Sequence, residues 1–165
     1  MWTVLKFDKK KIKDLKAIFQ KKLGSSPVFY IPKIKIQRFF KNQAKDYEFD
    51  VLGNYAFCYH EKIADAKIYP LLNNTIGLKY FLGGFSFCQD QITDFIKKCK
   101  SHEDKSGFLT QSFFQIKNNS DFQFISGPFN NFFFQLIEER KKKYVITLNS
   151  FKINISKDKT LFRTV

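Results

Sequence analysis

Cysteine is scarce in this 165-residue sequence, which contains only Cys58, Cys88 and Cys99. Their number is odd and no C-x-x-C pair occurs, so neither a disulfide framework nor a dithiol redox motif is expected. The two histidines, His60 and His102, do not stand at the spacing of zinc ligands relative to these cysteines. We therefore expect free thiols in a reducing cytoplasm, with no metal and no other cofactor.

Long apolar runs are missing as well. No stretch of about 18 apolar residues occurs, so no transmembrane helix is expected. The opening "MWTVLKFDKKKIK" lacks the apolar run and cleavage site of a signal peptide. Catalytic patterns are thin, because Gly83 and Gly84 lack G-x-G-x-x-G spacing, and Ser112 and Ser126 have no nearby histidine. We expect a monomeric binding protein rather than an enzyme.

Acidic residues are outnumbered, with 15 Asp and Glu against 29 Lys and Arg, for a net charge of +14. A field of this sign favours a polyanionic partner, and we expect nucleic acid rather than a membrane, because no basic helix has a broad aromatic face. The helix expected from Asp8 to about Leu23 is lysine-rich along one face, which is either a phosphate-binding surface or simply solvated. Its candidate contacts are Lys9, Lys10, Lys13 and Lys16.

The first part of the chain alternates strand and helix patterns in the order β-α-β-β-α-β-α, which predicts an α/β sandwich with helices packed on one face of a sheet. The expected strands are 2–7, 27–40 interrupted at Pro32, 47–60 with a kink at Gly53, and 77–84. Residues 41–46 are expected to form a hairpin loop. The expected helices are 9–23, stopped by Gly24, a short piece within 63–72, and 89–100.

The second part begins with a polar stretch and continues as short alternating runs. "SHEDKSG" at 101–107 indicates the start of a linker. From Phe122 the runs "FQFIS", "FFFQLIEE", "KYVITL" and "FKINIS" have the spacing of a small five-stranded β-barrel. The sequence thus predicts an α+β protein with domains at 1–101 and 119–165, joined by a linker at 102–118.

One expected strand alternates aromatic and small residues after Gly53. Tyr55, Phe57 and Tyr59 share one face, and Ala56, Cys58 and His60 share the other. Small residues suit close packing under helices, so we expect the aromatic face to be open. An exposed apolar face of this size usually marks an interface, although the hairpin or the second domain could also cover it.

Six short motifs follow one another in a specific order: "WTVL" at 2–5, "YIPK" at 30–33, "LGNYAFC" at 52–58, "GLKYFLGG" at 77–84, "FISGPFNNF" at 124–132 and "LFRTV" at 161–165. In order, spacing and total length the chain resembles the NusG family of transcription elongation factors, and particularly its specialised RfaH-type paralogs. It departs from the family pattern at Leu52, Gly53 and Phe133–Phe134, and 68–71 lacks the polar RfaH motif that contacts the polymerase gate loop.

The resemblance implies an N-terminal NGN-like domain that docks on the clamp helices of the largest catalytic subunit of RNA polymerase. The docking residues it implies are Trp2, Val4, Leu52, Tyr55 and Phe57. Docking would hold the clamp closed, suppress pausing and favour antitermination, with the lysine face toward upstream or non-template DNA. The KOW-like domain would recruit a ribosomal protein or Rho, or mask the docking residues.

The phenylalanine cluster after "SGP" belongs to the KOW-like part. We expect Phe129, Phe132 and Phe134 to line the barrel interior and a shared interface, while Phe133 takes the other face. RfaH-type domains also switch to a helical hairpin. "NNFFFQLIEERKKKY" has an asparagine cap and good helix formers, although the β-branched residues after it favour strand.

A second function is compatible with the same residues. A general RNA-binding KOW protein associated with translation would use the positive charge and exposed aromatic side chains to hold RNA.

Overall fold

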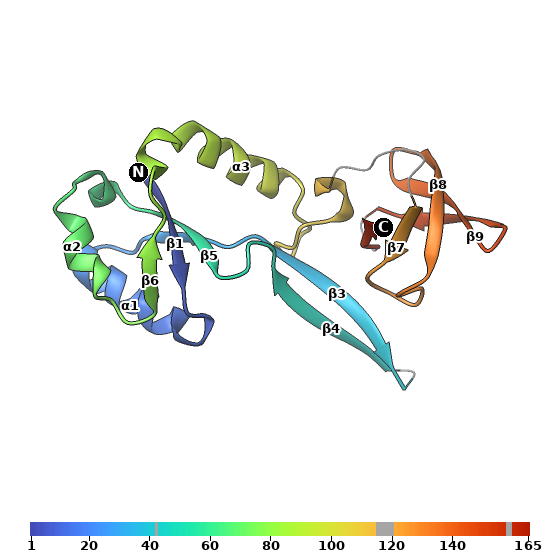
Figure 1. Ribbon diagram of the computed structural model, residues 1–165, viewed down its shortest axis with the longest axis horizontal. Coiled ribbons are helices and arrows are strands. Elements are labelled where there is room, and N and C mark those ends of the chain that lie inside the picture. Colours follow the sequence, from blue (N-terminus) through green and yellow to red (C-terminus); the bar gives the residue numbers. More distant parts are fainter. Residues whose placement is uncertain (42, 115–120, 158–159) are drawn as a thin grey trace. The chain divides into compact units, whose positions relative to one another are not determined.

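The computed structural model describes residues 1–41, 43–114, 121–157 and 160–165 and divides into two compact units (Figure 1). The N-terminal unit comprises Met1–Pro32 and Asp50–Lys97, and the C-terminal unit comprises Lys33–Phe49 and Lys98–Val165. These units differ from the predicted domains mainly because residues 33–49 group with the C-terminal part. The predicted linker and barrel boundaries stay predictions, since residues 115–120 lie outside the described part of the chain.

The N-terminal unit is built on an antiparallel sheet in the order β2-β5-β1-β6. Its strands are β1 (Trp2–Phe7), β2 (Val28–Tyr30), β5 (Tyr55–Tyr59) and β6 (Leu78–Phe81). Its helices are α1 (Ile12–Leu23), α2 (Ile68–Asn73) and α3 (Gln89–Ser101), the last extending beyond Lys97. Gly24 ends α1 as predicted, in the left-handed conformation with φ 82°, and its N–H bonds the Gln20 carbonyl.

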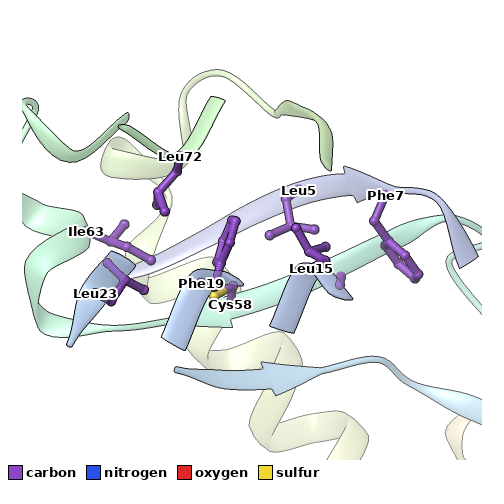
Figure 2. Close-up of a cluster of buried hydrophobic side chains, with 9 residues drawn as sticks. Leu5, Phe7, Leu15, Phe19, Leu23, Cys58, Ile63 and Leu72 are labelled. Carbon is purple, nitrogen blue, oxygen red and sulfur yellow. The ribbon is translucent and has the colours of Figure 1, made fainter. Parts of the chain in front are cut away.

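Helices cover both faces of this sheet, so the prediction of helices on one face was wrong. One core packs α1 and α2 against the inward residues of β1 and β5 (Figure 2). Its members are Leu5, Phe7, Leu15, Phe19, Leu23, Ala56, Cys58, Ile63 and Leu72. A second core sets Ile92 and Ile96 of α3 against Phe57 on the opposite face. Since successive strand residues point to opposite faces, Ala56 and Phe57 necessarily belong to different cores.

The predicted strand 47–60 is two strands. The hairpin of β3 (Lys33–Phe40) and β4 (Gln43–Asp50) is a separate two-stranded sheet, and all of it except Asp50 belongs to the C-terminal unit. Residues 51–54 form a turn, with Gly53 at φ 61°, before β5 begins. Pro32 interrupts the preceding strand as predicted, but Gln43–Asp46, expected in the loop, belong to β4, so the predicted loop was too long.

The C-terminal unit also contains a five-stranded antiparallel sheet in the order β10-β9-β8-β7-β11. Its strands are β7 (Asp121–Phe124), β8 (Phe133–Glu139), β9 (Lys143–Leu148), β10 (Phe151–Ser156) and β11 (Phe162–Thr164). All five contribute to one core, which includes Phe122, Phe134, Tyr144, Ile155 and Phe162. The number of strands matches the predicted five, while closure of this sheet into a barrel stays a prediction. The mixture of helices and sheets confirms the α+β class.

Candidate functional site

The aromatic face of β5 is assembled by its pairing with β1. Val4 lies opposite Phe57, Trp2 opposite Tyr59, and Lys6 opposite Tyr55. Residues directly opposite in an antiparallel ladder share a face, so the predicted aromatic side chains and the outward residues of β1 form one surface. We call this surface, which also includes Leu52, the docking face.

Phe57 is the buried centre of the docking face. Its side chain is only 7% exposed, under Ile92 and Ile96 of α3, with the Phe95 ring centroid 5.6 Å away. The prediction that this face is open was therefore wrong at Phe57. The periodicity of α3 was visible in the sequence, but nothing local indicated which face of the sheet it would cover.

Four of the five predicted docking residues meet in this cluster. Trp2, Val4 and Leu52 are partly buried and pack against the core formed by Phe57 and α3. Gln89, at the start of α3, fixes this arrangement, because its side chain accepts from Trp2 N at 2.9 Å and donates to Trp2 O at 2.8 Å. The indole of Trp2 also packs on Tyr59, with ring centroids 5.3 Å apart.

Tyr55 lies beside two residues that the sequence analysis missed. Its hydroxyl is 3.0 Å from that of Tyr80 on β6, and the Lys6 ammonium lies 5.4 Å and 5.5 Å from the two ring centroids. Their mutual hydrogen bond raises the pKa of Tyr55 and lowers that of Tyr80, and either hydroxyl can be the donor. The alternation of β1 could have indicated Lys6, two residues after Val4. Tyr80 required the pairing of β1 with β6.

The predicted lysine contacts are all exposed, but they are not equivalent. Lys9 pairs with Asp50 at 2.8 Å. Lys10 belongs with Lys9 to a 3-10 turn that Asp8 caps by accepting from Lys10 N at 3.0 Å. Lys13 and Lys16 lie on α1 itself, and the Lys16 ammonium is 5.4 Å from the Phe29 ring centroid.

Lys22, another lysine of α1, makes hydrogen bonds within the N-terminal unit. Its ammonium donates to the Leu71 carbonyl at 2.6 Å and to Thr75 Oγ1 at 3.0 Å. Lys62 plays a similar part at the end of α1, since it donates to the Leu23 carbonyl at 2.6 Å. Cations at a helix C-terminus complement the helix dipole.

The phenylalanines of the C-terminal unit separate into inside and outside groups. Phe134 is buried in the core, with its ring tilted against that of Phe124 at 4.3 Å between centroids, and Phe133 points outward as predicted. Phe132 is about half exposed at 49%, so it does not line the interior. Phe129 lies between the two groups: its ring centroid is 5.8 Å from that of Phe124, yet its side chain remains exposed.

Other site classes have little support in the part of the chain that the structure describes. No three His, Cys, Asp or Glu side chains in it are grouped so as to hold a metal ion. Among these same residues, no helix has the length and apolar character needed to span a membrane.

Comparison with known proteins yields matches only among solved structures. No family model and no curated protein matches the chain. A chain of the MjSpt4:Spt5 complex in conformation B matches with 10% identity and a TM-score of 0.31, over 100% of this chain and 99% of the other. NusG of Thermotoga maritima matches with 12% identity and a TM-score of 0.32, over 94% and 91%. Scores at this level do not identify a shared fold.

Proposed function

We propose that this chain is a transcription elongation factor of the NusG type that binds RNA polymerase through the docking face. The observation that carries the proposal is the clustering of Trp2, Val4, Leu52 and Phe57 on one face, with Tyr55 beside them. These residues come from two separate segments of the sequence, 2–4 and 52–57, and the family resemblance implies all of them as docking residues. A binding function needs no catalytic residues, and none is assigned.

The docking face would seat on the clamp helices of the largest catalytic subunit and hold the clamp closed, which suppresses pausing and favours antitermination. Phe57 is covered by α3 and only fixes the positions of its neighbours, while the more exposed Trp2, Leu52 and Tyr55 would supply the contacts. Aromatic anchors at the centre of an interface contribute roughly 2 kcal/mol or more each. The exposed lysines at positions 10, 13 and 16 would face upstream or non-template DNA.

The C-terminal unit would recruit a ribosomal protein or Rho, or mask the docking face as in the RfaH type. Its exposed Phe132 and Phe133 are suited to a protein contact. Strands occupy 133–139 and 143–148 in this structure, so a helical hairpin would be a second state. Retention of strand carbon shifts by NMR in the full-length protein under all conditions tested would contradict such a switch.

The experiment that tests the proposal is capture of core RNA polymerase by the full-length protein. Tyr55→Ala removes a partly exposed ring from the docking face, and we expect roughly 30-fold weaker capture, corresponding to about 2 kcal/mol. Tyr47→Ala is the matched control, because Tyr47 is an exposed tyrosine on β4 outside the docking face. Polymerase lacking its clamp helices should not be captured.

Two results would refute the proposal. One is equal capture by wild type and Tyr55→Ala, which would place binding elsewhere. The other is absence of capture together with salt-sensitive RNA binding, which would establish the general RNA-binding alternative.

A further inference from the structure

Four consecutive cations occupy the tight turn between β8 and β9 and the first position of β9: Arg140, Lys141, Lys142 and Lys143. We call these residues the basic turn. Arg140 N donates to the Lys143 carbonyl at 2.9 Å, which closes the turn, and all four side chains are exposed. The positive charge is therefore concentrated at one end of a hairpin, and this group is separate in sequence from the lysines of α1.

The basic turn is held on a rigid base. The hairpin below it is paired up to Glu139 and Tyr144, and Tyr144 is buried in the core of the sheet at 1% exposure. The end of β10 adds a third strand, because Lys157 N donates to the Lys142 carbonyl at 3.3 Å. A cationic group on a fixed backbone loses less conformational freedom on binding than one on a loose loop.

Nearby carboxylates neutralise only part of this charge. Glu138 pairs with Arg140 at 2.9 Å, and Glu139 pairs with Lys157, whose ammonium also lies 4.9 Å from the Tyr144 ring centroid. The salt bridges found among the described residues include none to the other three side chains of the turn, which are Lys141, Lys142 and Lys143.

Turn formation does not explain three adjacent lysines. Turns favour Gly, Pro, Asn, Asp and Ser, each for a conformational reason that lysine does not share. Neither Lys141 nor Lys142 adopts a positive φ angle. Adjacent like charges repel each other, and an anion bound outside the turn would remove this cost.

We propose that the basic turn is a nucleic-acid contact that binds the phosphodiester backbone through Lys141, Lys142 and Lys143. The exposed rings of Phe133 and Phe151 begin β8 and β10, at the ends of these strands away from the turn. The turn therefore contacts phosphates without base stacking and does not select sequence. This site is independent of the docking face and of the lysines on α1.

The test compares full-length proteins binding labelled single-stranded RNA over a range of salt concentrations. The triple variant Lys141→Gln, Lys142→Gln, Lys143→Gln is set against Lys67→Gln, Lys79→Gln, Lys105→Gln, three exposed lysines of loops and a strand edge. Both variants lose three charges, so the comparison separates a local site from net charge. Circular dichroism confirms that both remain folded.

We expect the basic-turn variant to lower the slope of log K against log salt by about 2, since each phosphate contact contributes about 0.7 with single strands. The control should change the slope much less. Competition with unlabelled duplex DNA then identifies the kind of nucleic acid that the turn binds. If duplex DNA competes as well as unlabelled RNA, the turn binds any phosphodiester backbone, and if it competes weakly, the turn prefers RNA.

The proposal is overturned if both variants lose affinity equally, or if neither does. It is also overturned if the three lysines affect binding only to phosphatidylglycerol vesicles and not to nucleic acid. Polymerase capture by the basic-turn variant should equal that of wild type, so failure of this proposal is distinguishable from failure of the polymerase proposal.

Discussion

Replacing Phe57 with alanine should destabilise the N-terminal unit strongly. Buried Phe→Ala changes cost about 3–5 kcal/mol, because apolar contact is lost and a cavity remains. Phe57 is 7% exposed and packs against the rings of Phe95 and Tyr30, at 5.6 Å and 6.3 Å between centroids. Both rings are only partly buried and can move inward, so we expect the lower end of that range, about 3 kcal/mol. Small domains are stable by about 5–15 kcal/mol, so much of the unit's stability would be lost.

Urea unfolding followed by tryptophan fluorescence measures this change directly. Trp2 is the only tryptophan and packs on the same cluster, so its emission reports the N-terminal unit. Phe87→Ala is the control, because Phe87 is 90% exposed and its loss should alter stability by no more than about 0.5 kcal/mol. Coincident unfolding midpoints for the two variants would refute the packing of α3 over Phe57. Because loss of Phe57 would destabilise the unit, Tyr55→Ala is the variant that tests docking.

Two further predictions concern a close backbone approach and a buried thiol. Gly77→Ala should lower the stability measured in thermal melts more than Gly84→Ala does. Both glycines have a positive φ, 87° and 78°, but only at Gly77 would an added Cβ meet another backbone atom, Lys11 O at 2.9 Å. We expect about 1 kcal/mol at Gly84 and about 1–3 kcal/mol more at Gly77, and equal losses would contradict the contact. Burial raises the pKa of Cys58 from 9.0 to about 12. The unfolded chain therefore releases this proton first, and stability should fall as pH rises between these values, by up to about 1.4 kcal/mol per pH unit. Urea midpoints of Cys58→Ala should fall less steeply, and parallel profiles would contradict the assignment.

Elements set by local chemistry could be predicted from the sequence. The apolar spacing of Ile92, Phe95, Ile96 and Cys99 predicts a helix, and α3 spans Gln89–Ser101. Gly24 ends α1 and Pro32 interrupts a strand where expected, because glycine readily adopts a positive φ and proline has no backbone N–H to donate. Four strands of the five-stranded sheet, β7 to β10, lie within or overlap the four alternating runs, because alternation is a local property of the sequence.

Features set by contacts distant in sequence could not be predicted. The face covered by α3 depends on how it packs against β1 and β5, which no local pattern records. The turn at 51–54 separates strands of two different sheets, although the residues on both sides are typical of one strand. Tyr55 and Tyr80 are neighbours because β1 lies between β5 and β6 in the sheet. This strand order could not be predicted, so Tyr80 was not among the residues predicted for the docking face.

The order of segments in the two units has a consequence for the gene. Residues 33–49 belong to the C-terminal unit, yet they are encoded between the two halves of the N-terminal unit. Hydrogen bonds join this hairpin to the later sequence, from Gln37 N to Ser126 Oγ at 2.8 Å, from Gly127 N to the Gln37 carbonyl at 2.8 Å and from Leu109 N to the Lys33 carbonyl at 2.7 Å. A single recombination event therefore cannot exchange the C-terminal unit as a block. A new C-terminal domain acquired by a relative would have to re-form these bonds with the inherited hairpin, which ties the evolution of the two segments together.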